Sequence, residues 1–186
     1  MNQKRLIALI DANVLIPVVI GDLLVTLAAC GGFTAVLSPV VLEEVVRNQP
    51  NSRNRMKNMF DFFSNDIVQI LPTEIDKVPT VVNRKDAHLV VAAEKSGSNF
   101  IITNDSALTV EVASGDFEFM CIGPWEFLLL VAQAQPYSIS AMVEEIAHKR
   151  RDPNQWTVDA VWDLILRNGG SQARKVKSIT ENYFPK

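Results

Sequence analysis

The sequence predicts an α/β fold with a central parallel, doubly wound sheet and a helical C-terminal extension. Short apolar runs alternate with longer stretches in which apolar residues recur at helical spacing, the pattern of a parallel sheet whose strands are joined by helices. With 186 residues, 48% of them hydrophobic, the chain is long enough to bury one sizeable core. After Pro136 the pattern is helical only, which predicts the extension.

Local signals mark the elements in order along the chain. The run 6–10 ends at Asp11, and Pro17 suits the first turn of a helix that Gly31-Gly32 terminates. Ser38-Pro39 combines an N-cap with a favourable first helical residue. The predicted strands are residues 6–10, 33–37, 67–71, 100–103 and 117–122. The predicted helices are residues 17–30, 39–47, 56–63, 85–96, 124–134, 140–150, 157–168 and 171–183.

Composition excludes several classes of protein. A net charge of −3, from 18 basic and 21 acidic residues, together with the high apolar content excludes a disordered chain. The two cysteines, Cys30 and Cys121, are too few for a disulfide framework and too isolated for a zinc site, so we expect a reducing, cytoplasmic environment.

The first 31 residues have features of a secretion signal, but the match is poor. Lys4 and Arg5 precede an apolar stretch, and 27–31 is similar to a lipoprotein cleavage site. Because Asp11 and Asp22 interrupt that stretch, we interpret it as mature protein. No apolar stretch is long enough to cross a bilayer, and we expect no membrane partner.

Carboxylates gather where the predicted strands end. Asp11 and Asp105 directly follow strands, Asp86 begins a helix, and Glu43 and Glu44 lie early in the helix after the second strand. The carboxyl ends of parallel strands and the starts of the following helices meet at one sheet edge. Such a cluster is costly unless cations occupy it, and hard oxygen ligands favour Mg²⁺ or Mn²⁺. Taken singly, Asp86 is also typical of the first turn of a helix. Glu43 and Glu44, taken singly, are also typical of the solvated face of a helix.

Four segments together resemble the acidic motifs of PIN-domain nucleases, a family that includes the VapC toxins. Residues 6–16 resemble the opening motif, 38–45 the second, 86–93 the third and 101–105 the fourth. In the second motif a serine stands six residues before the acid, which selects Glu44 over Glu43. The resemblance covers residues 4 to about 125.

The resemblance implies a PIN-like three-layer αβα nuclease domain over residues 1–135, with the extension over 136–186. It implies metal-dependent cleavage of RNA, with Mg²⁺ or Mn²⁺ at a catalytic site. The implied catalytic and metal-binding residues are Asp11, Glu44, Asp86 and Asp105. The residues implied to orient these carboxylates by hydrogen bonds are Asn13, Thr103 and Asn104.

In two places the sequence departs from the family pattern. Many relatives carry a further acid and a phenylalanine after the fourth motif, where this chain has residues 106–108, Ser-Ala-Leu. The number of metal ions, one or two, is therefore open. Asn13 replaces the commoner hydroxyl residue but can still donate and accept hydrogen bonds.

A basic cluster follows Glu44 and is our candidate contact for RNA phosphates, although a solvated helix face explains it equally well. Its members are Arg47, Arg53, Arg55 and Lys57. Besides RNA, the resemblance suggests a protein antitoxin and a second copy of the chain as partners. We expect the helical tail to serve packing or partner binding, because it carries no ordered carboxylate motif.

Two other functions fit part of the sequence. Residues 11–13, Asp-Ala-Asn, nearly match the Asp-x-Asp opening of haloacid-dehalogenase-like phosphatases, but the second Asp is absent and no lysine partner is evident. A PIN scaffold that has lost catalysis and only binds partners is the non-enzymatic alternative, because a fold does not establish activity.

Overall fold

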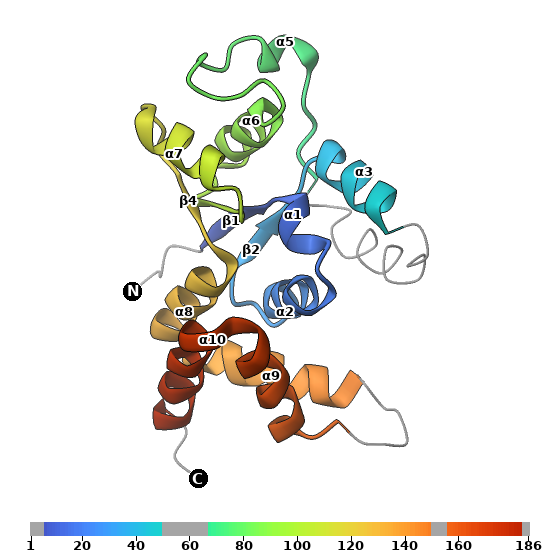
Figure 1. Ribbon diagram of the computed structural model, residues 1–186, viewed down its shortest axis with the longest axis vertical. Coiled ribbons are helices and arrows are strands. Elements are labelled where there is room, and N and C mark those ends of the chain that lie inside the picture. The colour runs from blue at the N-terminus through green and yellow to red at the C-terminus, as the bar shows by residue number, and fades with distance from the viewer. Residues whose placement is uncertain (1–5, 50–66, 150–155, 184–186) are drawn as a thin grey trace. The chain divides into compact units, whose positions relative to one another are not determined.

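A four-stranded, all-parallel sheet forms the centre of the first of two compact units (Figure 1). The computed structural model describes residues 6–49, 67–149 and 156–183. The strands are β1 (Ile7–Ile10), β2 (Thr34–Val36), β3 (Phe100–Ile102) and β4 (Met120–Ile122), in the order β2-β1-β3-β4. The predicted α/β class with a parallel sheet is confirmed.

The strand order places a topological switch point at the carboxyl ends of β1 and β3. The chain leaves β1 toward β2 on one side and leaves β3 toward β4 on the other, so the winding direction reverses between these two central strands. Ala8, Leu9 and Ile10 are fully buried, as are Ile101 and Ile102, which is why both strands are continuous apolar runs. Ligands of open α/β sheets bind at such a reversal.

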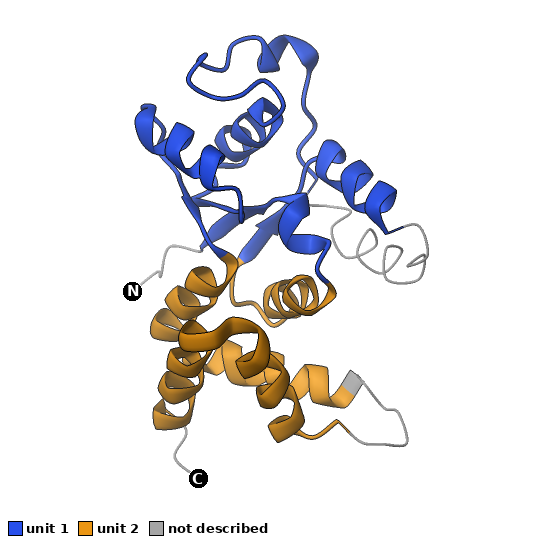
Figure 2. Ribbon diagram, in the orientation of Figure 1, with its two compact units in different colours: residues 1–17, 34–123 blue, residues 18–33, 124–186 orange. Residues whose placement is uncertain are grey.

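Unit 1 comprises residues 1–17 and 34–123 (Figure 2). Its helices are α1 (Ala12–Leu15), α3 (Pro39–Asn48), α5 (Pro72–Ile75), α6 (Ala87–Ser96) and α7 (Ser106–Ser114). Helix α6 packs on β1 and β3, and α7 packs on β4. Ser38, fully buried, caps α3 by accepting a hydrogen bond from Val41 N at 3.2 Å, as its sequence predicts.

Unit 2 is helical and comprises residues 18–33 and 124–186. It contains α2 (Val18–Ala29), α8 (Pro124–Ala134), α9 (Pro136–Lys149) and α10 (Val158–Tyr183), with α10 packed on α8 and α9. Gly170, at φ 53° and ψ −127°, breaks α10 between the two helices that the sequence predicts. A side chain on the preceding Gly169 would collide with the Trp125 ring, so glycine is required there. The proposed functional boundary at residue 135 stays a prediction.

The predicted strand 67–71 is wrong beyond its first residue. Only Ile67 forms a parallel bridge, to Leu37, and Val68 N donates to Leu37 O at 2.9 Å. The ladder cannot continue because Leu37 is followed directly by Ser38, the cap of α3. Three helices were not predicted from sequence: the single turns α1 and α5 and the longer α7. The predicted helix 56–63 lies outside the described residues.

Among residues 6–49, 67–149 and 156–183, no helix combines the length and apolar character needed to span a bilayer.

We predict that Gly97→Ala destabilises the fold by about 1 kcal/mol, because non-glycine residues are strained in the left-handed region. Gly97 ends α6 at φ 63°, and an added Cβ would meet no atom within 4 Å, so the cost is conformational only. The free energy of unfolding from urea denaturation measures it. Gly97→Asn is the matched control and should cost less, since asparagine tolerates this conformation. Equal costs for both variants would contradict the explanation.

Candidate active site

Asp11 lies at the carboxyl end of β1, beside β3, where the winding direction of the sheet reverses. Its backbone N–H extends the ladder by donating to Ile102 O at 3.0 Å, and α1 begins at the next residue. The residue is only 7% exposed. A carboxylate is therefore held at the centre of the sheet edge, where little water reaches it.

Asn13 and Thr103 hold the Asp11 carboxylate in place. Asp11 Oδ2 accepts from Thr103 Oγ1 at 2.7 Å and from Asn13 Nδ2 at 2.6 Å. Asn13 Nδ2 also donates to Thr103 Oγ1 at 3.1 Å, which closes a three-membered network. The sequence assigned these two residues the role of orienting carboxylates, and the structure brings both to Asp11.

The same two side chains bind the loop that follows β3. Asn13 Oδ1 accepts from the backbone N–H of Asn104 at 3.1 Å, and Thr103 Oγ1 accepts from that of Asp105 at 3.0 Å. Asn104, also predicted to orient a carboxylate, contributes its backbone to the network while the residue itself is exposed. The ends of β1 and β3 are thus cross-linked by side chains.

Burial dominates the electrostatics of Asp11. It raises the pKa of the carboxyl above its ordinary value of 3.8, the hydrogen bond from Thr103 opposes it, and the negative charge of Glu44 raises the pKa further. Glu44 is half-buried on α3 whereas Glu43 is exposed, and only Glu44 is coupled to Asp11. The structure therefore favours Glu44 in the choice that the sequence left between the two.

Asp105 caps α7 with one oxygen and leaves the other free of backbone contacts. Its Oδ1 accepts from Ala107 N at 2.8 Å and from Leu108 N at 3.1 Å. These bonds, that from Leu108 foremost, lower the pKa of Asp105, and the positive charge of Lys85 lowers it further. Asp105 stays ionised because of the helix that it begins.

Asp86 precedes α6 but makes no capping hydrogen bond. Its side chain is 15% exposed, and within the described residues its buried Oδ2 accepts no hydrogen bond. Burial raises the pKa of Asp86, Lys85 opposes the rise, and the negative charges of Asp105 and Asp11 add to it. Asp11, Asp86 and Asp105, which we call the carboxylate cluster, thus lie near enough for the charges of the other two to act on Asp86.

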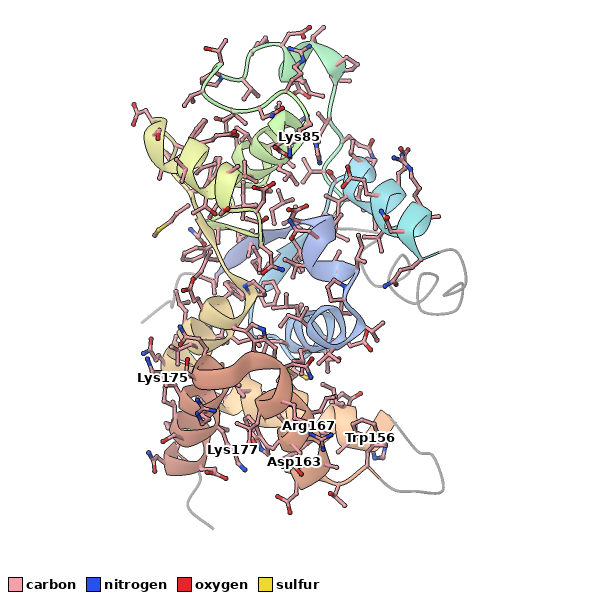
Figure 3. All side chains as sticks on the ribbon, in the orientation of Figure 1. Lys85, Trp156, Asp163, Arg167, Lys175 and Lys177 are labelled. Atoms are coloured by element: carbon pink, nitrogen blue, oxygen red, sulfur yellow. The ribbon has the colours of Figure 1, made fainter. Side chains whose placement is uncertain are left out.

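Lys85 is the cation of this cluster, and the sequence analysis did not single it out. Its Nζ lies 3.5 Å from Asp86 Oδ2 and 3.7 Å from Asp105 Oδ2, at the N-terminal end of α6 (Figure 3). The two aspartates raise the pKa of Lys85, Asp86 more than Asp105. A lysine beside an acid is too common in sequences to have marked this position.

His88 and Cys121 are two further side chains close to the aspartates, and neither is placed to act as a nucleophile. His88 is 6% exposed and its Nδ1 lies 2.9 Å from Lys85 O, a contact in which the ring nitrogen donates. Burial raises the pKa of the Cys121 thiol to about 12, with help from the charges of Asp11 and Asp105. Cys121 therefore stays a thiol at neutral pH and is no nucleophile.

The donor chemistry of the cluster fits a hard divalent ion, but its geometry is not that of a finished site. Carboxylate oxygens are the ligands that Mg²⁺ and Mn²⁺ prefer, and Asp86 Oδ2, which accepts no hydrogen bond within the described residues and lies 3.5 Å from Lys85 Nζ, could take such an ion as a closer partner. Within residues 6–49, 67–149 and 156–183, however, no three acidic, histidine or cysteine side chains converge closely enough to hold a metal.

Of the predicted RNA-binding cluster, the structure describes Arg47 alone. It is exposed in the last turn of α3, three residues after Glu44. Arg53, Arg55 and Lys57 lie outside the described residues.

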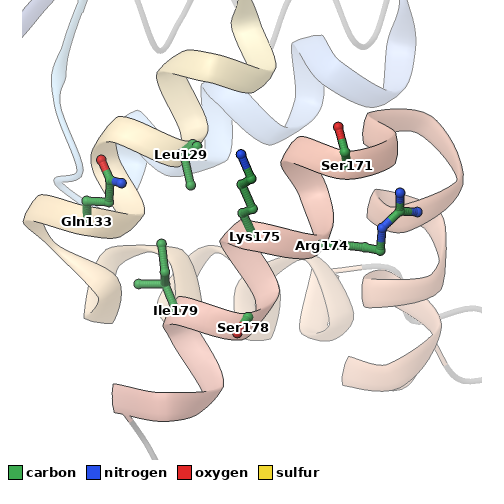
Figure 4. Close-up of a pocket in the computed structure, with 7 residues that line it drawn as sticks. All are labelled: Leu129, Gln133, Ser171, Arg174, Lys175, Ser178 and Ile179. Carbon is green, nitrogen blue, oxygen red and sulfur yellow. The ribbon is translucent and has the colours of Figure 1, made fainter.

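A groove lies within unit 2, and none of the predicted catalytic residues lines it. This groove, of about 470 Å³, lies between α8 and the second half of α10 (Figure 4). Leu129 and Ile179 are its apolar residues and Arg174 and Lys175 its cations; the other lining residues are Gln133, Ser171 and Ser178. The expectation that the tail serves packing or partner binding stays a prediction.

No protein-family model, curated protein or solved structure matches this chain. Its function must therefore be argued from the carboxylate cluster itself.

We predict that Asp11→Asn stabilises the metal-free protein at neutral pH. Because the folded-state pKa of Asp11 is raised, ionising it costs stability as the pH rises from 3.8 through the folded value. The asparagine Oδ1 can still accept from Thr103 and Asn13. Urea denaturation with a chelator, from pH 4 to 7, should show the variant gaining on the wild type as pH rises.

Asp163→Asn, the same substitution at an exposed position of α10 remote from Asp11 in sequence, is measured beside it as the control. An advantage of Asp11→Asn that shrinks toward neutral pH would contradict the electrostatic explanation.

Proposed function

We propose that this protein is a metal-dependent ribonuclease with a PIN-like, three-layer fold that hydrolyses RNA phosphodiester bonds. The observation that supports the proposal is the position of Asp11, which is buried at the carboxyl end of β1, accepts hydrogen bonds from Thr103 and Asn13, and feels the negative charge of Glu44. Burying carboxylates together is unfavourable for folding, so a protein that does so needs them for chemistry. The four acidic motifs of the sequence supply the same residues in the same order.

Asp11, Glu44, Asp86 and Asp105 would hold Mg²⁺ or Mn²⁺. A bound divalent ion would supply positive charge for the scissile phosphate and lower the pKa of an attacking water. Asp11 is the best-fixed ligand, because Thr103 and Asn13 both donate to one of its oxygens. Arg47, exposed three residues beyond Glu44, is our choice for a phosphate contact.

We further propose that the chain is the toxin of a toxin–antitoxin pair, a role that rests on the resemblance of residues 6–16, 38–45, 86–93 and 101–105 to PIN-domain toxins. A small DNA-binding antitoxin encoded directly upstream would support it.

RNA cleavage should require both a divalent cation and Asp11. Asp11→Asn keeps the shape of the side chain but removes the charge, so we expect cleavage of a mixed RNA substrate to fall by about 10²-fold or more. The assay follows RNA fragments on denaturing gels with Mg²⁺, with Mn²⁺ and with excess chelator. Asp163→Asn should keep wild-type activity.

Two results of that assay would refute the nuclease mechanism. One is wild-type cleavage that a chelator leaves unchanged, and the other is full activity of folded Asp11→Asn. Metal-dependent release of phosphate from p-nitrophenyl phosphate without RNA cleavage would favour the phosphatase alternative instead.

Induced expression in a bacterial host tests the toxin role separately. The wild type should arrest growth, and Asp11→Asn, expressed to the same level, should not, because growth arrest needs cleavage of cellular RNA. Equal growth in both cultures would count against a toxin while leaving the nuclease proposal intact.

A further inference from the structure

Lys85 forms ion pairs with two of the four carboxylates that would hold the metal, Asp86 and Asp105. Its Nζ is 3.5 Å from Asp86 Oδ2 and 3.7 Å from Asp105 Oδ2. Both separations exceed the 2.7–3.2 Å typical of N–H···O hydrogen bonds, so the contacts are ion pairs without tight directional bonding. The ammonium neutralises two carboxylates at once but binds neither firmly.

The lysine reaches the cluster from the solvent side. Its side chain is 63% exposed, against 15% for Asp86 and 27% for Asp105. Withdrawing the ammonium would break no hydrogen bond of a helix cap, whereas turning Asp105 away would leave the first turn of α7 uncapped. Lys85 is therefore the most easily exchanged member of the cluster.

Hydrogen bonds hold the backbone of Lys85, whereas its long side chain can adopt several rotamers. Asn83 Oδ1 accepts from Lys85 N at 3.2 Å, and His88 Nδ1 donates to Lys85 O at 2.9 Å. Four flexible methylene groups then carry the ammonium to Asp86 and Asp105. The chain thus holds the lysine at the rim of the cluster whether or not its charge lies between the aspartates.

We propose that Lys85 is an exchangeable counter-ion of the carboxylate cluster, which a divalent cation must displace in order to bind. This inference rests on the proposed metal-dependent function. It explains why no three ligands converge in the described part of the chain: the aspartate oxygens are spaced around an ammonium rather than around an ion that needs bonds of about 2.1 Å. Lys85 is thereby a positioning residue, and it sets the ion concentration at which the site fills.

Titration calorimetry with Mn²⁺ as the probe tests the exchange on the full chain. Lys85→Met removes the competing charge and keeps the length of the side chain, so we expect its dissociation constant for Mn²⁺ to fall about tenfold. Lys85→Arg keeps the charge and should remain within about twofold of the wild type. Lys175→Met, an exposed lysine of α10, is the matched control and should bind as the wild type does.

Each calorimetric outcome decides something. Tighter binding by Lys85→Met alone supports the exchange. Equal binding of Mn²⁺ by the wild type and Lys85→Met overturns the exchange and leaves the proposed function standing. Weaker binding by Lys85→Met also overturns the exchange, because it shows that Lys85 assists binding of the ion. Absence of Mn²⁺ binding in both proteins overturns the exchange and the metal-dependent function together.

A measurement on the wild type avoids dependence on any variant. If Mg²⁺ displaces the ammonium, Lys85 should react several-fold faster with acetic anhydride when Mg²⁺ is present, as peptide mass spectrometry would show. Lys175 should react at the same rate in both conditions and serves as the internal reference. Unchanged or slower labelling of Lys85 at saturating Mg²⁺ would overturn the proposal.

Discussion

The hydroxyl of Thr103 is the group on which the geometry of the candidate site depends. It donates to Asp11 and accepts from Asn13 and from the backbone of Asp105, so its one donor and two acceptor positions are all used. Thr103 and Asp11 are 92 residues apart in sequence and meet because β1 and β3 pair in parallel, with Ile10 opposite Ile102. A shift of that register by one residue would turn the side chains to the other face and break every bond in the network. The sheet register therefore fixes the site, and the network in turn favours this register.

The burial of Asp11 and Asp86 lowers the stability of the fold, a cost that is typical of functional residues. Burial raises the pKa of Asp11 and of Asp86, so each carboxylate is less stable in the fold than in water. Lys85 offsets the cost at Asp86, but it is largely exposed and its effect is screened by solvent. An apolar residue at position 11 would pack at the end of β1 without this cost. Polar groups that lower stability at a sheet edge are typical of functional sites.

Sequence predicted those elements whose signals are local, and missed those that depend on tertiary pairing. The strand at 7–10, the Ser38 cap and the end of α6 at Gly97 each follow from a few neighbouring residues. Helix α7 was missed because only Leu108 and Val112 are buried, too few for a clear apolar face, and because its start signal, Asp105, was interpreted as a metal ligand alone. The strand expected at 67–71 failed because its partner, Leu37, ends where a helix begins. In the site, the orienting roles of Asn13 and Thr103 were expected from the resemblance to PIN-domain nucleases, whereas Lys85 contacts the carboxylates because the fold brings Asp86 and Asp105 to the same lysine.

The two aspartates that contact Lys85 differ in how far they can move, and this difference constrains how a metal site would form. Asp105 Oδ1 is held by two backbone N–H groups of α7, so turning this side chain would leave the first turn of the helix uncapped. Asp86 has no capping bond and its Oδ2 accepts no hydrogen bond within the described residues, so rotating its side chain breaks no hydrogen bond there and gives up the 3.5 Å ion pair with Lys85. Asp11 is fixed by Thr103 and Asn13. A divalent ion would therefore meet two fixed carboxylates, Asp11 and Asp105, and the ligand shell would be completed by movement of Asp86 and withdrawal of Lys85.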